Sequence, residues 1–315
     1  MINVLVTSLG SNTAIGVIKA LRLNKQISVT IIGTDTFPKH LSAGSSMADH
    51  FYQVPLASAD EYDAQLLGII KQHDINCVIP IHDYEIVKVA HLALKFPLLT
   101  FWAVNSPAII SLCNNKKEIN ELLSKQQIKV PEMYDSLAGL SYPALYKPNT
   151  GVSSKGIQRI DASGTGTQHF DLDKGFLQKM VSGIEYTVDC YTSYREDYFN
   201  CCVRKRIETK EGISTKGETV DNEMLKNICS GIHSLLNYKG ASNIQFIVDN
   251  EVPYFIEINP RFSGAGILSY HSNLNSPLFT VLESVQSPLF KDLRNIPVKK
   301  GVFMTRYWNE NFYEG

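Results

Sequence analysis

Three polar side chains recur at every second position of one apolar segment. Glu257, Asn259 and Arg261 lie within residues 254–264, where the intervening positions are mainly apolar. Because successive side chains of a strand point to opposite faces, this spacing predicts that the three share one face of a sheet. A buried charge is stable only when it is paired, hydrogen-bonded or bound to a cation. The segment therefore predicts either a ligand site or a structural ion pair between Glu257 and Arg261.

A second apolar segment, residues 243–248, precedes the first and is predicted to pair with it as a β-hairpin. An odd-numbered loop centred on Glu251 would place Gln245 opposite Glu257, whereas a two-residue loop would send Gln245 to the other face. Oxygen donors from Gln245, Glu257 and Asn259 suit Mg²⁺, which keeps several waters and is completed by substrate phosphates. We therefore expect these three residues to hold Mg²⁺.

A loop rich in Gly, Ser and Thr follows a predicted strand that ends near Lys147. Glycines permit positive φ and carry no Cβ, so the N–H groups of such a loop can approach an anion closely. The loop predicts either a phosphate cradle or an ordinary flexible hairpin, and it lacks the Walker spacing G-x-x-x-x-G-K-[ST]. Its candidate phosphate-binding residues are Lys147, Gly151, Ser153, Ser154 and Gly156.

Between these two regions lies the pattern Q-x-M-V-x-G-x-E at residues 178–185. A Gly/Ser loop, then this pattern, then E-I-N-P-R at residues 257–261, resembles the ATP-grasp superfamily, and in particular its carbamoyl-phosphate-synthase-like branch. The resemblance covers nearly the whole chain. It implies an ATP-grasp fold and the binding of ATP with Mg²⁺, with two ions expected at Gln245, Glu257 and Asn259 and Mn²⁺ as an alternative metal.

Carried over position by position, the resemblance assigns two lysines to the nucleotide. Lys147 would contact the ATP phosphates, and an earlier lysine would also reach the nucleotide. The superfamily usually has Asp before that earlier lysine, but here Asn115 precedes Lys116 and Lys117 follows it. Lys116 and Lys117 therefore remain alternatives for this contact.

The same resemblance assigns the adenosine-binding groups. The main-chain groups of Lys179 and Val181 would hold the adenine edge beside Met180, and Glu185 would accept hydrogen bonds from the ribose. Gln178 stands at a position that is often acidic in the superfamily, which puts its nucleotide contact in doubt.

Arg204 and Arg206 alternate on a predicted strand and therefore share a face. Together they could bind a substrate carboxylate or the γ-phosphate, or they could be charges that protect a solvated edge strand. The resemblance also implies that Arg261 stabilises the transferring phosphoryl group. Arg306 and Tyr307 are further candidates for an acceptor pocket.

Composition excludes several other classes of protein. The 315 residues are 44% hydrophobic and 19% charged, with a net charge of −1, which is typical of a globular protein and does not favour a nucleic-acid partner. The six cysteines lack metal or redox spacing and suit a reducing compartment, and the adjacent Cys201 and Cys202 are expected to point to opposite faces of a strand. No signal peptide or long apolar run is present at the start. We therefore expect a cytoplasmic location, no membrane partner and small-molecule substrates.

The predicted fold class is α/β, becoming α+β in the C-terminal part. Residues 1–104 alternate strands (3–7, 29–33, 77–81, 99–103) with helices (13–23, 59–73, 85–94), which predicts a Rossmann-like pre-ATP-grasp domain. Its first turn lacks G-x-G-x-x-G, so a dinucleotide site is not expected. Ser58 and Glu61 form a predicted capping box at the start of the second helix. A helical connection (105–136), which begins with Ser106 and Pro107 in N-cap and N1 order, is expected to follow. An ATP-grasp lid subdomain (137–181) and a catalytic subdomain (182–315) with an amphipathic helix over residues 225–236 are expected after it.

The resemblance implies an ATP-dependent carboxylate–amine ligase that forms a C–N bond. Such an enzyme activates a small-molecule carboxylate as an acyl phosphate, releases ADP and phosphate, and lets an amine or related nucleophile attack. The alternatives are a carbamoyl-phosphate-synthase-like fragment and a catalytically inactive nucleotide-binding regulatory module. A homodimer is also expected.

Overall fold

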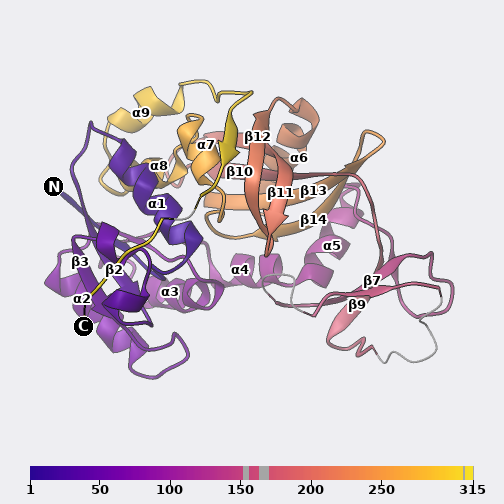
Figure 1. Ribbon diagram of the computed structural model, residues 1–315, viewed down its shortest axis with the longest axis horizontal. Coiled ribbons are helices and arrows are strands. Elements are labelled where there is room, and N and C mark those ends of the chain that lie inside the picture. The colour runs from indigo at the N-terminus through magenta and orange to yellow at the C-terminus, as the bar shows by residue number, and fades with distance from the viewer. Residues whose placement is uncertain (152–155, 163–169, 308, 315) are drawn as a thin grey trace.

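A computed structural model of the protein describes residues 1–151, 156–162, 170–307 and 309–314. Three sheets organise the chain (Figure 1). A parallel sheet lies in the N-terminal part, a larger antiparallel sheet occupies the C-terminal half, and a small antiparallel sheet projects as a separate lobe. The mixed α/β character predicted from the sequence is confirmed.

The parallel sheet has the strand order β3-β2-β1-β4-β5. Its strands are β1 (Ile2–Val6), β2 (Val29–Asp35), β3 (His50–Gln53), β4 (Cys77–Ile79) and β5 (Phe101–Trp102). The connecting helices are α1 (Asn12–Leu23), α2 (Tyr62–Gln72) and α3 (Asp83–Lys95), with two short 3₁₀ turns, η1 (Lys39–Leu41) and η2 (Ser45–Met47). The strand order reverses between β1 and β4, and open α/β sheets bind ligands at the carboxyl edge of such a reversal.

Two local expectations for this domain were wrong. Strand β3 was not predicted, because only Phe51 and Tyr52 interrupt its polar sequence and it pairs with β2 alone, at the sheet edge. Helix α2 begins at Tyr62, and its N-cap is Glu61 without a side-chain cap. The predicted start near residue 59, with Ser58 as the capping residue, therefore lies before the observed helix.

The helical connection is divided in two. Helix α4 (Pro107–Asn114) begins as predicted, with Ser106 accepting from the N–H of Ile109 and proline in the first turn. Asn115 ends α4 and caps α5 (Lys116–Lys125), where its side chain accepts from the N–H of Glu118. This double use of Asn115 fixes the main chain next to Lys116.

The projecting lobe is an antiparallel sheet with the order β6-β9-β7-β8. Its strands are β6 (Met133–Tyr134), β7 (Ala144–Pro148), β8 (Gln158–Ile160) and β9 (Gly175–Lys179). The lobe has its own small core, which includes Ala144, Ile160 and Leu177. Its sheet starts at Met133, a few residues before the position at which the lid was expected to begin.

The large antiparallel sheet has the order β14-β13-β10-β11-β12-β15. Its strands are β10 (Ile184–Thr192), β11 (Phe199–Lys210), β12 (Ile213–Val220), β13 (Gly240–Asp249), β14 (Val252–Asn259) and β15 (Phe303–Thr305), and its helices are α6 (Glu223–Leu235), α7 (Ile267–His271), α8 (Ser276–Ser284) and α9 (Leu289–Arg294). The predicted amphipathic helix is α6, whose Leu225, Cys229 and Ile232 are buried.

Helices cover both faces of this sheet. Helices α4, α5 and α6 pack with Cys201 on one face, while α8 and α9 pack with Cys202 on the other. The expectation that these adjacent cysteines point to opposite faces is confirmed, and all six cysteines are buried as free thiols. Phe262 and Tyr270 pack into the core around α1, so the N-terminal domain is joined to the C-terminal part by apolar contact.

Within the described residues, no helix is both long enough and apolar enough to cross a bilayer.

Candidate active site

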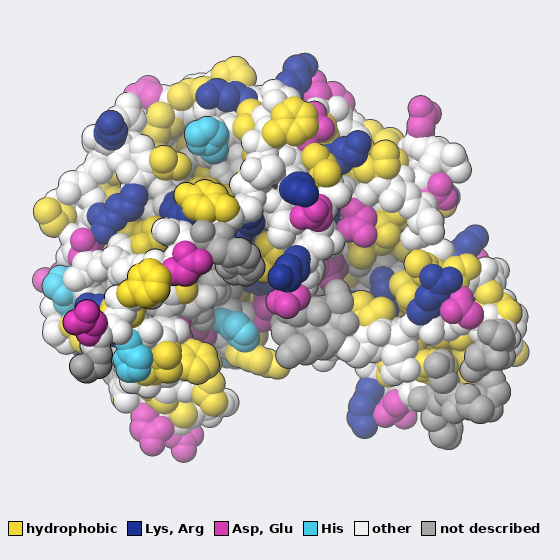
Figure 2. Space-filling model, in the orientation of Figure 1, with side chains coloured by type: hydrophobic (Ala, Val, Ile, Leu, Met, Phe, Trp, Pro, Cys, Tyr) yellow, Lys and Arg dark blue, Asp and Glu magenta, His cyan; other side chains and the backbone are white. Residues whose placement is uncertain are grey.

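One cavity of about 560 Å³ is bounded by all three sheets. The N-terminal domain contributes the start of α1 and the residues after β4, the lobe contributes β7 and β9, and the large sheet contributes its central strands. Figure 2 shows acidic and basic side chains intermixed over the middle of the face that it presents, beside the projecting lobe.

The hairpin of β13 and β14 pairs Gln245 with Glu257 through a shorter turn than expected and a β-bulge. The turn has only two residues, Asn250 and Glu251, because Asp249 pairs with Val252. Both turn residues have positive φ, 46° and 67°. A two-residue loop alone would separate Gln245 from Glu257, but a β-bulge at Ile256 shifts the register by one, and Gln245 pairs with Glu257.

The structure thus corrects the loop length and keeps the predicted pairing. Gln245, Glu257 and Asn259 all line the cavity. Arg261 follows the end of β14 and also lines it. The alternative of an ion pair between Glu257 and Arg261 is wrong, because Arg261 pairs with Asp83 instead.

The three expected metal ligands offer a suitable set of oxygen atoms. Glu257 Oε1 accepts from Asn259 Nδ2 at 3.1 Å, and Glu257 makes no ion pair within the described part of the chain. Gln245 Oε1 accepts from Arg206 Nη1 at 2.9 Å. One free carboxylate with two amide oxygens fits Mg²⁺. The described residues contain no cluster of three or more His, Cys, Asp or Glu that could hold a metal.

Lys147 lines the cavity from β7 and is 6% exposed. Its Nζ donates to Gln178 Oε1 at 2.7 Å. Burial lowers the pKa of Lys147 to about 8; the nearby carboxylate of Glu257 opposes this fall, and the charge of Lys116 adds to it. An anionic ligand in the cavity would therefore favour the charged form of this lysine.

Gln178 supports Lys147 and does not line the cavity. Its side chain is 1% exposed, and its Nε2 donates to Asn120 Oδ1 and to the carbonyl of Pro131, both at 3.2 Å. The side chain of Gln178 thus contacts Lys147 in this structure, and its nucleotide contact stays a prediction.

Lys116 reaches the cavity, whereas Lys117 is not among the residues that line it. The Nζ of Lys116 donates to the carbonyl of Gly151 at 2.7 Å, and its main-chain N–H donates to the carbonyl of Asn149 at 2.7 Å. The geometry therefore favours Lys116 for the nucleotide contact. Gly151 also lines the cavity, Gly156 does not, and Ser153 and Ser154 lie outside the described residues.

The expected adenine edge follows β9. Lys179 and Val181 line the cavity, and Met180 does not. The N–H of Lys179 donates to Glu132 and that of Met180 to Pro143, leaving the N–H of Val181 without a partner within the described residues. Val181 can therefore donate to a purine. Glu185, whose side chain is half exposed, lines the same cavity.

Arg204 and Arg206 lie on β11, which is an interior strand between β10 and β12. The side chains of Arg204 and Arg206 are only 1% and 8% exposed, so the alternative of a solvated edge strand is wrong. The Nε of Arg206 lies 3.5 Å from Glu185 Oε2 and makes no hydrogen bond within the described chain. Burial lowers the pKa of Arg206, which Glu185 opposes.

Arg204, unlike Arg206, is held by two hydrogen bonds to one carboxylate. Its Nε and Nη2 donate to the two carboxylate oxygens of Asp189 at 2.7 and 3.0 Å. Burial acts to lower the pKa of Arg204, but Asp189 outweighs burial and the net direction is upward. This residue therefore supports the wall of the cavity.

Two of the remaining candidates do not line the cavity. Arg306 donates to the carbonyl of Gly264 and does not line the cavity, while Tyr307 is 86% exposed. Glu85, beside Asp83, is buried and accepts from Thr7 and Tyr62. Sequence reasoning missed Ser263 and Asp189, although the serine stands two residues after Arg261 in the same segment.

Comparisons with known proteins agree with this architecture. A family model described as ATP-grasp domain matches residues 113–265, and one described as PylC-like, N-terminal domain matches residues 4–99. The carbamoyl phosphate synthase large chain of Clostridium botulinum (strain Alaska E43 / Type E3) is 23% identical over 274 residues, covering 78% of this chain and 24% of the relative. That of Clostridium acetobutylicum is 24% identical over 184 residues, covering 49% of this chain and 17% of the relative. The chain thus spans a quarter or less of the length of these relatives.

Solved structures show the same fold at low sequence identity. An L-amino acid ligase from Bacillus licheniformis has a TM-score of 0.69 at 16% identity, covering 95% of this chain and 78% of that chain. An N5-carboxyaminoimidazole synthetase from Staphylococcus aureus has a TM-score of 0.67 at 14% identity, covering 90% of this chain and 77% of that chain. The two family matches show that the chain contains an ATP-grasp domain, over residues 113–265, which follows a PylC-like N-terminal domain over residues 4–99.

Proposed function

We propose that this chain is an ATP-dependent carboxylate–amine ligase. It activates a small-molecule carboxylate as an acyl phosphate, releases ADP and phosphate, and forms a C–N bond when an amine or related nucleophile attacks. ATP and Mg²⁺, with two ions in the cavity, are the implied ligands, and Mn²⁺ is a possible substitute. The observation that supports this most is the meeting of Gln245, Glu257 and Asn259 with Lys147 and Lys116 in one cavity.

The proposed metal ligands and the cationic residues contact the nucleotide in different ways. Mg²⁺ held by Gln245, Glu257 and Asn259 would neutralise charge on the terminal phosphates. Lys147 and Lys116 would bind the phosphates from the lobe, and Val181 would fix the base at the other end. This arrangement directs the terminal phosphorus toward Arg261.

The chemistry requires no side-chain nucleophile. The substrate carboxylate attacks the terminal phosphorus in line, so that a bond from carboxylate oxygen to phosphorus forms as the bond to ADP breaks. The amine then attacks the acyl carbon, loses a proton and displaces phosphate. Arg261 stabilises charge on the phosphoryl group in both steps.

The compartment and assembly of the protein belong to this proposal too. Six buried free thiols suit a reducing compartment such as the cytoplasm. The homodimer expected from the resemblance stays a prediction.

ADP release across a panel of carboxylic acids and amines tests the proposal. We expect one acid to stimulate ADP release, and an amine to increase it further, with hydroxylamine trapping the activated acid as a hydroxamate. Stimulation by bicarbonate alone would favour a carbamoyl-phosphate-synthase-like reaction. Tight nucleotide binding without stimulation by any acid would favour a regulatory module and contradict the ligase.

A further inference from the structure

A serine that lines the cavity has both of its lone pairs occupied by protein donors. Ser263 Oγ accepts from Nη2 of Arg204 at 2.9 Å and from the N–H of Ala265 at 3.3 Å. A serine hydroxyl has two acceptor lone pairs and a single donor hydrogen. That hydrogen reaches no acceptor within the described part of the chain, although Ser263 is only 9% exposed and borders the cavity.

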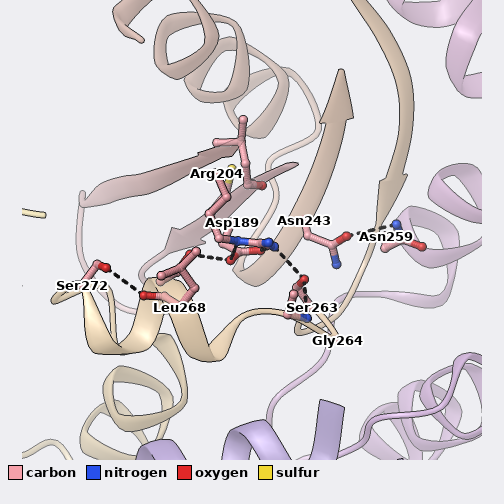
Figure 3. Close-up of polar contacts among 12 residues, drawn as sticks. Asp189, Arg204, Asn243, Asn259, Ser263, Gly264, Leu268 and Ser272 are labelled. Carbon is pink, nitrogen blue, oxygen red and sulfur yellow. Dashed lines mark hydrogen bonds and ion pairs between the residues drawn. The ribbon is translucent and has the colours of Figure 1, made fainter. Parts of the chain in front are cut away.

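The orientation of this hydroxyl is set by a buried ion pair. The guanidinium of Arg204 binds both oxygens of Asp189, and Ser269 Oγ donates to Asp189 Oδ2 at 2.5 Å. Figure 3 shows the guanidinium lying between the Asp189 carboxylate and Ser263. Because a bidentate pair of buried groups has one favourable geometry, the donor that reaches Ser263 is held in place.

Neighbouring serines use their hydrogens within the protein. Ser272 Oγ donates to the carbonyl of Leu268 at 2.8 Å, as Figure 3 also shows. Ser269 donates to Asp189. Only Ser263, of these three, lines the cavity and keeps its hydrogen for an acceptor outside the described chain. A buried hydroxyl hydrogen without an acceptor costs free energy, so an acceptor supplied by a ligand is favourable.

Resting on the proposed ligase function, we infer that the hydroxyl of Ser263 donates a hydrogen bond to an anionic oxygen of the reacting group. Arg204 and Asp189 are positioning residues that orient this donor. The oxygen belongs to the substrate carboxylate or to the phosphoryl group transferred to it, since both are oxyanions at the end of the cavity beside Arg261. Ser263 transfers no proton. Its hydrogen bond orients the oxyanion, whereas the charge of Arg261 stabilises it.

The test measures oxyanion binding in the presence of nucleotide. Inorganic phosphate is titrated with Mg·ADP, and acetate is titrated with Mg²⁺ and a non-hydrolysable ATP analogue, each followed by ligand-observed NMR. We expect Ser263→Ala to weaken one of these two titrations by roughly tenfold or more, as for a lost hydrogen bond to a charged group. The titration that changes identifies the source of the oxygen.

Two variants and one control separate this role from a structural one. Ser263→Thr keeps the hydroxyl and should restore binding. Arg204→Lys keeps a charge beside Asp189 but loses the bond to Ser263, so it should weaken the same titration as Ser263→Ala. Ser272→Ala, which removes a buried hydroxyl that does not line the cavity, should bind as wild type does.

The inference fails if Ser263→Ala and Arg204→Lys bind phosphate and acetate as wild type does. It also fails if the wild type binds Mg·ADP but neither oxyanion, a result that leaves nucleotide binding intact. If Ser263→Ala does not fold, the inference is overturned when Arg204→Lys binds phosphate and acetate with the same affinity as the wild type. Failure of the wild type to bind Mg·ADP would instead contradict the proposed function itself.

Discussion

Arg261 and Asp83 lie 178 positions apart in the sequence, and Nε of the arginine donates to Oδ1 of the aspartate at 2.8 Å. The contact joins the end of β14 to the start of α3, so it links the large sheet to the N-terminal domain at the wall of the cavity. The side chains of Arg261 and Asp83 are 21% and 14% exposed. The arginine that we propose to contact the phosphoryl group is thus oriented by a residue of the N-terminal domain.

The first prediction concerns this pair. Asp83→Asn keeps an acceptor for Arg261 but removes the charge, so the guanidinium is held less firmly. We expect turnover to fall about tenfold, the scale of a weakened charged hydrogen bond, with nucleotide affinity unchanged. Asp63→Asn is the control, because Asp63 pairs with Lys88 at 3.3 Å and does not line the cavity. If Asp83→Asn and Asp63→Asn both turn over at the wild-type rate, Asp83 does not orient Arg261.

The second prediction concerns the metal-ligand set. Glu257→Gln preserves shape but removes the one carboxylate among the three oxygen donors, so Mg²⁺ would be held weakly. We expect loss of Mg²⁺-dependent ATP turnover with an unchanged thermal unfolding midpoint. The matched control is Glu251→Gln, in the exposed turn of the same hairpin. Wild-type turnover in Glu257→Gln would exclude Glu257 as a ligand.

The third prediction follows from the lowered pKa of Lys147, about 8. In the free protein this lysine loses its proton as the pH rises through about 8, and the neutral amine attracts phosphate less strongly. We therefore expect the dissociation constant of Mg·ADP to increase through that range. Lys147→Arg carries a cation that does not titrate there, and it should remove this increase. A pH dependence that is the same in both proteins would assign it to another group.

The lowered pKa of Lys147 also predicts the direction in which the free energy of unfolding changes with pH. The pKa in the folded protein, about 8, lies below the ordinary value of 10.5, so the unfolded chain binds more protons between these values. The contribution of Lys147 to the free energy of unfolding is therefore most unfavourable below about 8 and becomes less so as the pH rises toward 10.5. Urea unfolding of wild type and Lys147→Met across this range should show the difference, and parallel curves would contradict it.

The local elements of this fold were largely predictable from the sequence. The alternation of strands and helices before residue 104 follows from hydrophobic periodicity, and Ser106 with Pro107 marks a helix start by capping and fixed φ. Strand β3 was not predicted because an edge strand, which pairs with β2 alone, needs few apolar residues. Hydrophobic periodicity therefore predicts a helix or strand well where one face of that element is buried and must be apolar.

The register of the central hairpin was harder to predict. Asn250 and Glu251 form a two-residue turn at positive φ. Because this conformation is uncommon for glutamate, residue types at these positions do not indicate so tight a turn. The bulge at Ile256 then restores the pairing of Gln245 with Glu257. The two departures cancel, which is why the predicted pairing was confirmed while the predicted loop was wrong.

Partners distant in the sequence could not be predicted from one chain. Asp189 and Arg204 meet across β10 and β11, and Arg204 then reaches Ser263 beyond β14. Each of these residues is ordinary in its own segment. Their combination depends on strand order and on the side chains' burial, which periodicity does not encode.

The fifth prediction tests the role of Arg261 in phosphoryl transfer. Arg261→Ala should slow formation of the activated acid by ~10²–10³, the scale for removal of a preorganised charge stabiliser. Hydroxamate formed in the presence of hydroxylamine measures this step apart from amine attack. Retention of the wild-type rate would remove Arg261 from the phosphoryl-transfer step.

The most direct test of the central claim is the identity of the nucleotide product. Phosphorus NMR of a reaction with ATP, Mg²⁺, a stimulating acid and an amine follows both possible outcomes at once. Arg261 follows the end of β14 and Val181 precedes the start of β10, and the strand register places these at opposite ends of the sheet. Attack at the terminal phosphorus is therefore predicted, and ADP and inorganic phosphate should appear in equal amounts. AMP and pyrophosphate as the stoichiometric products would contradict the acyl-phosphate mechanism and the role assigned to Arg261.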